Sequence, residues 1–222
     1  DIDELKELVI KVQNSDIVSI DLETTSVNPM VAEIVGVSIS LKKNEGFYIP
    51  VLYLEKNKNN FGADDLKIVL EQIKDFLEND KIKKVGQNIK YDTLILLRNG
   101  INVKGIYFDT MVAASILNPS ARSYKLDMLS IEFLNYTMVP IDDLIGRGKD
   151  QITMDMVPIE KAAYYAAEDA DIVLQLSQIF ISKLEENKQM DFFIDIEMPL
   201  ITVLTKMELE GVFVDQESLN VM

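Results

Sequence analysis

Strand-like segments come first as a hairpin and then alternate with helix-like segments, and this order limits the folds open to the chain. Residues 16–23 alternate and are rich in β-branched side chains, which predicts a strand entering the polar loop 24–29. Two more apolar, β-rich runs, 33–41 and 46–51, flank a polar turn and predict an antiparallel hairpin. Paired strands followed by strand–helix alternation indicate a mixed sheet covered by helices, so we expect an α/β layer fold.

Several segments space their apolar residues as helices do, and we expect these helices to cover the sheet. The pattern predicts helices at 3–14, 63–79, 89–98, 158–186 and 191–210, a strand at 83–85, and a strand followed by a helix within 106–117. Asp109 precedes the apolar run of that last pair and is expected to cap its helix. The stretch 140–158 holds Gly146 and Gly148 among polar residues, and we predict a loop there.

The residue types that are absent narrow the possible chemistry. The 222 residues include neither Cys nor His, which excludes disulfides, thiolate zinc sites and hydrolysis by Ser–His or Cys–His machinery. Histidine is also the commonest general base near neutral pH. Any catalysis therefore depends on carboxylates, Tyr, Lys or bound metal ions.

The charge balance bears on which partners the chain can hold. It carries 37 acidic and 22 basic residues, a net charge of -15, whereas tight sequence-independent binding of nucleic acid needs Lys and Arg to neutralise phosphates. A nucleic-acid enzyme of this charge would use bound metal ions for local positive charge and a basic neighbouring domain for grip.

Asp21 and Glu23 lie two residues apart on the first predicted strand. Their side chains therefore leave the same face, near the strand's C-terminal end. Burying two carboxylates side by side is costly unless a proton or a cation neutralises them. A solvated strand end, with Glu23 capping the following loop, is the alternative explanation for the pair.

Further candidates lie on predicted helices. Asp92 falls in the first turns of its helix, where an acid also stabilises the helix dipole. Tyr165 and Asp169 are four residues apart on the long helix and share one face, although a core tyrosine and a solvated charge would give the same pattern. Glu168 and Asp171 point elsewhere on that helix, and we expect both to be solvated.

As a set, the four carboxylates indicate a metal site. Mg²⁺ and Mn²⁺ prefer oxygen ligands and are usually held by a few carboxylates, water and substrate phosphate. Two such ions roughly 4 Å apart suit in-line phosphodiester hydrolysis. In a chain without His, this is the most natural hydrolytic chemistry.

Three short motifs carry a family resemblance. Asp-Leu-Glu at 21–23, Asn-Ile-Lys-Tyr-Asp at 88–92 and Tyr-Ala-Ala-Glu-Asp at 165–169 resemble the motifs of the DEDDy exonucleases, which share an RNase H-like fold. The closer resemblance is to the proofreading 3′→5′ exonuclease domain of family A DNA polymerases, through residues 85–88, 109–111, 146–149 and 165–171. It spans essentially the whole chain and implies an RNase H-like mixed sheet flanked by helices.

The resemblance implies a role for each acidic residue. Asp21 would bridge two divalent ions, Mg²⁺ or Mn²⁺. Glu23 and Asp169 would complete the first ion site, and Asp92 would hold the second ion largely through water. Tyr165 would orient the nucleophilic water, because a phenol with an ordinary pKa near ~10 positions water at neutral pH more readily than it removes a proton.

The resemblance also implies substrate contacts and an activity. Thr24 and Asn88 would contact the terminal nucleotide, and Val27 and Ile141 would lie against the terminal bases, where the family uses apolar or aromatic side chains. The implied function is removal of nucleotides from DNA 3′ ends, with release of nucleoside 5′-monophosphates. We expect a preference for single-stranded or frayed ends, because base pairs must open before the terminal phosphodiester can reach the metals.

The C-terminal segment resembles the junction at which the polymerase domain of that family begins. We therefore expect an exonuclease domain at 1–190 and the start of a truncated polymerase domain at 191–222, with DNA and the polymerase domain of the same chain as partners.

The sequence shows no signal peptide and no apolar run near the ~18 residues of a membrane span. The expected location is the nucleoid in a bacterial cytoplasm, or an organelle in a eukaryote.

Three alternative functions can be weighed against the sequence. An RNase D-like RNA 3′-exonuclease would share the acids and the tyrosine but should lack the polymerase-like tail. A catalytically weak or inactive structural module would have lost acids, whereas here the set is complete. A plain acidic binding domain would leave five residues at these spacings as a coincidence.

Overall fold

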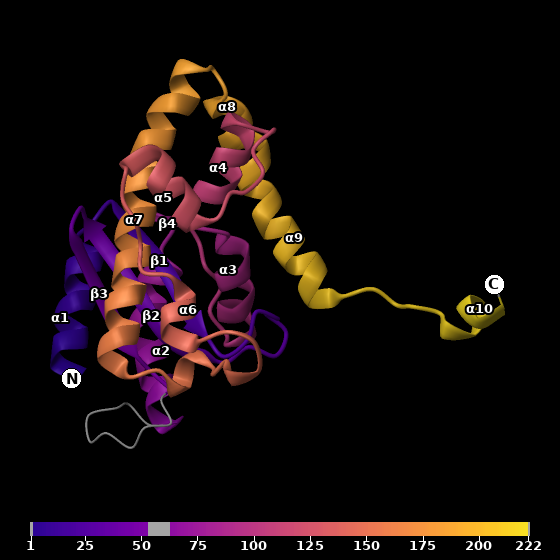
Figure 1. Cartoon of the computed structure of the whole chain (residues 1–222), viewed down its shortest axis with the longest axis horizontal. Helices are drawn as coiled ribbons and strands as arrows, with labels where there is room; N and C mark the ends of the chain where they lie inside the picture. Colours follow the sequence, from indigo (N-terminus) through magenta and orange to yellow (C-terminus); the bar gives the residue numbers. More distant parts are fainter. Residues whose placement is uncertain (1, 53–62, 222) are drawn as a thin grey trace.

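A five-stranded mixed sheet forms the centre of the computed structural model, which describes residues 2–52 and 63–221 (Figure 1). The strands are β1 (Ile17–Thr24), β2 (Ile34–Lys42), β3 (Glu45–Pro50), β4 (Lys83–Gly86) and β5 (Ile106–Asp109). Their order is β3-β2-β1-β4-β5, with antiparallel pairing from β1 through β3 and parallel pairing among β1, β4 and β5. The α/β fold with a mixed sheet is confirmed, including the hairpin of β2 and β3.

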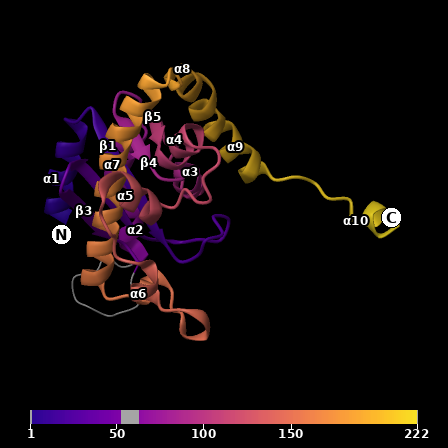
Figure 2. The ribbon, with the colours of Figure 1, turned by 45° about the horizontal axis from the view of Figure 1, so that its top comes forward.

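Helices cover both faces of this sheet. They are α1 (Ile2–Gln13), α2 (Ala63–Leu77), α3 (Ile89–Arg98), α4 (Thr110–Leu117), α5 (Leu126–Leu134), α6 (Ile141–Ile145), α7 (Ile159–Glu186), α8 (Met190–Phe192), α9 (Met198–Glu210) and α10 (Gln216–Val221). Helix α7 runs across β1, β2 and β3, while α1 and α2 pack against each other. Figure 2 shows the chain turning at α8, after which α9 descends beside α3. Within the described residues, no helix combines the length and hydropathy that a bilayer-spanning segment requires.

The long helix α7 approaches the sheet closely because small residues face it. Ala162, Ala166 and Ala170 are buried and recur every four residues along one side of the helix. A Cβ placed on Gly46 of β3 would lie 2.5 Å from the carbonyl oxygen of Ala167, so only glycine fits at that contact. Any functional side chain on this side of α7 is therefore held close to the strands.

Part of the chain departs from the predicted elements. The stretch 140–158, predicted as a loop, contains α6 and two 3₁₀ turns at Gly148–Asp150 and Met154–Met156. A helix of five residues is too short to show a periodic pattern in the sequence. Helix α5 was not predicted, since apolar residues lie on its exposed side as well: Met128 and Ile131 are exposed while Leu129 is buried.

The predicted helix 191–210 is interrupted by a π-helical turn at Phe193–Glu197. Pro199 lies near the start of α9 and cannot donate a hydrogen bond to the residue four positions before it, Asp195. Such a missing bond favours a wider turn. The ring of Phe193 packs against that of Phe108, with 4.6 Å between centroids, which anchors the turn on β5.

Asp109 caps α4, as predicted, and also fixes the start of α3. Its Oδ1 accepts hydrogen bonds from the backbone N–H groups of Met111 (2.8 Å) and Val112 (3.0 Å), and its Oδ2 accepts one from Ile89 (2.7 Å). Burial raises the pKa of this carboxyl, and the N–H donors partly offset the effect. One buried carboxylate thus joins the N-termini of two helices.

We predict that Asp109→Ala lowers the free energy of unfolding by about 2–4 kcal/mol, because it removes a helix cap and leaves buried N–H groups unpaired. Urea denaturation followed by circular dichroism measures this change. Asp127→Ala is the matched control, since Asp127 is exposed and accepts a hydrogen bond from the neighbouring N–H of Met128. An equal, small effect of both variants would contradict the bridging role.

Candidate active site

Three carboxylates from two elements meet above the central strand. Asp21 and Glu23 lie on β1 and Asp169 lies on α7, and one oxygen from each falls within 4.8 Å of the others. The spacing of two residues on a strand puts Asp21 and Glu23 on the same face, and the close approach of α7 brings Asp169 to them. Glu23 and Asp169 are buried, whereas Asp21 is partly buried.

Asp92 lies beside this cluster, in the first turn of α3. It is buried, its carboxylate accepts a hydrogen bond from the backbone N–H of Leu22 on β1, and its pKa is raised by burial and then by the nearby charge of Asp21. It is not among the three residues that share the 4.8 Å set. The four predicted acids are therefore neighbours, with Asp92 set apart from the tight group.

The three carboxyl groups of the cluster have raised pKa values, so their negative charges favour neutralisation by a proton or a cation. Burial raises the pKa of Asp21 to about 7. Burial also raises the pKa of Glu23 and of Asp169, and in both cases the nearby charge of Asp21 raises it further. A bound divalent cation would offset the repulsion among these three carboxylates. Hard cations such as Mg²⁺ and Mn²⁺ prefer oxygen ligands, so the residues present fit either ion.

Tyr165 lies on the same side of α7 as Asp169, and the two side chains are hydrogen bonded. Burial raises the pKa of the Tyr165 hydroxyl, and the charges of Asp169 and Glu23 raise it further. The hydroxyl therefore stays protonated at neutral pH. It can orient a water molecule by hydrogen bonding but is unsuited to remove a proton.

The four residues predicted to contact substrate differ in their exposure and in their local contacts. Thr24 ends β1, and its Oγ1 is 2.6 Å from the hydroxyl oxygen of Tyr91. Asn88 precedes α3 in a left-handed conformation (φ 54°) and its exposed side chain makes no capping bond. Val27 and Ile141 are both exposed apolar residues, as a base-contacting role requires.

Two neighbours of the cluster do not behave as expected. Glu168 and Asp171 were predicted to be merely solvated, and this is wrong. Glu168 accepts hydrogen bonds from the Tyr136 hydroxyl (2.7 Å) and the Val139 N–H (2.8 Å), and Asp171 accepts one from the Asn44 N–H (2.8 Å). Both carboxylates bind segments far away in the sequence, so no local pattern could have indicated them.

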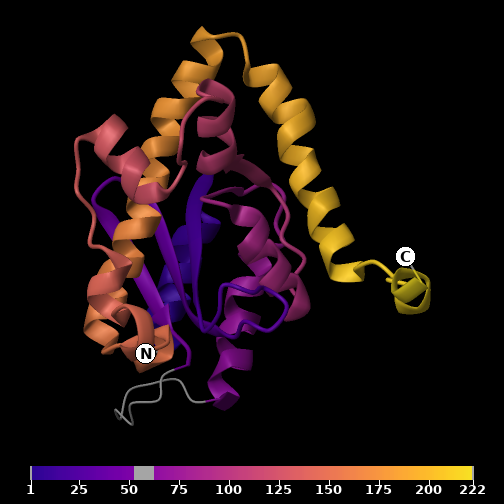
Figure 3. The ribbon, with the colours of Figure 1, turned by 45° about the vertical axis from the view of Figure 1, so that its right-hand side comes forward.

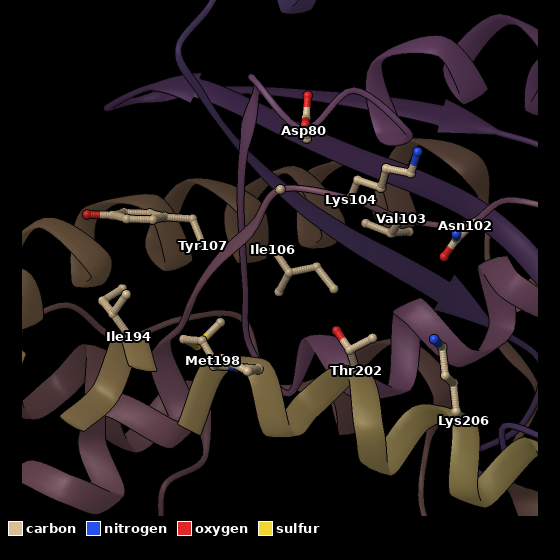
Figure 4. A pocket seen from close by; sticks show the side chains of 12 residues that line it. Asp80, Asn102, Val103, Lys104, Ile106, Tyr107, Ile194, Met198, Thr202 and Lys206 are labelled. Carbon is tan, nitrogen blue, oxygen red and sulfur yellow. The ribbon is translucent and has the colours of Figure 1, made fainter. Parts of the chain in front are cut away.

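A separate cavity of about 450 Å³ lies between β5 and α9 (Figure 4). Apolar side chains such as Ile106 and Met198 form part of its wall, and Lys104 and Lys206 stand at its rim. None of the predicted site residues lines it. The acidic cluster therefore lies outside this cavity.

The fold and the cluster together define the class of protein, which is an α/β domain of the nuclease type. Asp21 and Glu23 lie on the central strand β1, and Asp169 and Tyr165 lie on α7, the helix that crosses the sheet. The model of the 3′–5′ exonuclease family found in A-type DNA polymerases matches residues 1–185. The chain belongs to this family.

Curated relatives extend well beyond this chain. It is 35% identical over 217 residues to DNA polymerase I of Pseudomonas aeruginosa, which covers 95% of the chain and 23% of that relative. It is 36% identical over 217 residues to DNA polymerase I of Chloroflexus aurantiacus, covering 97% of the chain and 22% of the relative. The chain thus spans less than a quarter of the length of these relatives.

Solved structures share the fold. A POL domain of Pol1 from M. smegmatis, in complex with DNA primer-template and dNTP, matches with a TM-score of 0.72 and 19% identity over 96% of this chain and 32% of that one. NrnC from Brucella melitensis with bound Mg²⁺ matches with a TM-score of 0.68 and 17% identity over 91% of this chain and 89% of that one. At these identities the likeness concerns the fold.

Proposed function

We propose that this domain removes nucleotides from DNA 3′ ends by hydrolysis, with two divalent ions, as the proofreading exonuclease of a DNA polymerase I-type enzyme. The observation that carries the proposal is the meeting of Asp21, Glu23 and Asp169 within 4.8 Å, in surroundings that raise their pKa values. A buried cluster of like charges costs stability unless it binds cations. We therefore propose that the cluster serves metal-dependent chemistry.

The acids divide between two proposed ion sites. The charge of Asp21 acts on Glu23, Asp92 and Asp169. In this proposal Asp21, Glu23 and Asp169 would hold one ion, and Asp21 with Asp92 would hold the other. When bound, two divalent ions supply the positive charge that lowers the pKa of an attacking water and stabilises the leaving oxygen. The carboxylates fix where that charge lies relative to β1 and α7.

Tyr165 completes the proposed mechanism. Its protonated hydroxyl is held by Asp169 at the edge of the cluster. From there it would orient the attacking water in line with the scissile P–O bond, which would release a nucleoside 5′-monophosphate. Orientation of this kind contributes by fixing a near-attack geometry rather than by transferring a proton.

The substrate is proposed to be a single-stranded or frayed DNA 3′ end. In this proposal Thr24, Asn88, Val27 and Ile141 would contact the last nucleotides. A net charge of -15 gives the domain little hold on a duplex through phosphate neutralisation. Stacking and apolar contact with unpaired bases are less dependent on net charge.

We further propose the division into an exonuclease domain at 1–190 and the beginning of a polymerase domain at 191–222. The family match ends at residue 185, and the relatives named DNA polymerase I are several times longer. The polymerase domain of the same chain would then be the partner that brings DNA to this site. The proposed location is the cytoplasm of a bacterium.

A 5′-labelled DNA oligonucleotide with a 3′ overhang tests the function. We expect a ladder of products shortened from the 3′ end in Mg²⁺ or Mn²⁺, lost in EDTA, with slow cleavage of a blunt duplex. A matched RNA oligonucleotide is the control for substrate class, and its preferred degradation would favour an RNase D-like exonuclease. Folded protein that cleaves neither substrate at high concentration would contradict the proposal and favour a structural module.

A further inference from the structure

The loop that follows β1 presents apolar side chains to solvent beside the acidic cluster. Val27 is 95% exposed, and Met30 and Val31 on the same loop are also exposed. Because the loop continues directly from Thr24, its position relative to β1 decides where these side chains meet a substrate. Exposed apolar residues grouped on one loop indicate a contact surface for an apolar ligand face such as a nucleobase.

Bonds within the loop give it a defined shape. The Thr25 N–H donates to the Glu33 carbonyl (3.0 Å), and the Glu33 N–H donates to Thr25 Oγ1 (3.0 Å), which closes the base of the loop. The Asn28 carbonyl accepts hydrogen bonds from Val31 (3.1 Å) and Ala32 (3.0 Å). These bonds shape the loop but do not attach it to the rest of the domain.

Helix α3 provides the attachment, at two points. The Tyr91 hydroxyl donates to the Ser26 carbonyl, and Arg98 Nη1 donates to the carbonyls of Pro29 (2.6 Å) and Ala32 (3.2 Å). Tyr91 and Arg98 are seven residues apart, close to two helical turns, and so project from the same side of α3. In Figure 3 the indigo loop lies alongside the purple helix α3.

We infer that Arg98 is a positioning residue for the substrate: it fixes the loop 25–33 on α3 so that Val27 stands against the base at the DNA 3′ end. The two carbonyls that it binds lie on the C-terminal side of Val27, while Tyr91 binds the carbonyl on the N-terminal side. The same helix carries Asp92 in its first turn. Helix α3 therefore positions both this loop and Asp92, the carboxylate beside the cluster. The inference rests on the proposed function.

Steady-state kinetics on a single-stranded DNA oligonucleotide test this role. Arg98→Met keeps the aliphatic stem and removes the donors, and we expect KM to rise about tenfold while kcat changes less than about threefold, because the carboxylates remain in place. Lys74→Met is the matched control. Lys74 Nζ donates to the Gly100 carbonyl (3.0 Å), just beyond α3, without touching the loop, and KM should not change. An unchanged KM in Arg98→Met would overturn the inference.

A double-mutant cycle separates positioning from a general loss of structure. If Arg98 acts through the loop, Val27→Ala should raise KM in the wild-type background but add little in the Arg98→Met background. Additive effects of the two substitutions would contradict the coupling.

Salt dependence separates positioning from direct binding of a DNA phosphate. Losing one phosphate contact on single-stranded DNA changes the slope of log KM against log salt by about 0.7. We expect equal slopes for wild type and Arg98→Met. A slope reduced by that amount would assign Arg98 to phosphate binding and overturn its positioning role.

Amide hydrogen exchange gives a measurement that does not need activity. The Val31 and Ala32 amides should exchange faster in Arg98→Met, and the Lys74→Met control should leave them unchanged. Absence of any wild-type cleavage would defeat the proposed function, whereas unchanged exchange in Arg98→Met would defeat the loop attachment itself.

Discussion

Replacing Asp21 by Asn is expected to lower cleavage of a single-stranded DNA 3′ end by at least about 1,000-fold. Asp21 is the acid whose charge acts on Glu23, Asp92 and Asp169, which places it at the centre of the cluster. The amide keeps the size of the side chain but removes the charge that both proposed ion sites share. Initial rates on a 5′-labelled oligonucleotide at saturating Mn²⁺ measure the effect.

Asp16→Asn is the matched control for this experiment. Asp16 directly precedes β1, is exposed and lies at the opposite end of the strand from the cluster. We expect its rate to stay within about twofold of wild type, because surface substitutions of this kind rarely disturb a fold. An Asp21→Asn enzyme that kept more than a tenth of the wild-type rate would remove Asp21 from the assigned chemistry.

The sequence predicted the elements that carry the cluster, for identifiable reasons. Period-two alternation placed Asp21 and Glu23 on one face of a strand, and a four-residue spacing placed Tyr165 and Asp169 on one face of a helix. The sequence did not predict how close the strand face and the helix face lie to each other. In the structure this distance depends on the buried alanines of α7, whose small size lets the helix lie close to β1 and β3.

The contacts that local patterns could not predict join segments distant in sequence. Arg98 binds carbonyls 66 and 69 positions away, and Glu168 binds groups 29 and 32 positions away. An exposed arginine at a helix end ordinarily interacts with the dipole or with solvent. Only the tertiary fold shows that this one holds a loop beside the site.

Metal-free protein is expected to lose stability as the pH rises from about 4 to about 7, and divalent ions are expected to restore it. In the folded state the pKa of Asp21 is raised from 3.8 to about 7 by burial. Between these values the folded state binds more protons than the unfolded state, so the free energy of unfolding falls as the pH rises. The loss attributable to this carboxyl is roughly 2–4 kcal/mol.

Thermal unfolding in EDTA at several pH values, for wild type and Asp21→Asn, measures this loss. The overall charge of -15 also weakens the fold as carboxyl groups ionise, but it does so almost equally in both proteins, so their difference isolates the cluster. We expect the variant to melt roughly 5–10 °C higher than wild type at pH 8 in EDTA, with the gap closing by pH 4. Saturating Mn²⁺ at pH 8 should stabilise wild type more than the variant, because only the folded wild-type cluster binds it strongly. If the two proteins responded alike to pH and to Mn²⁺, the carboxylates would not form a charged, cation-binding cluster, and the metal-dependent mechanism would lose its structural basis.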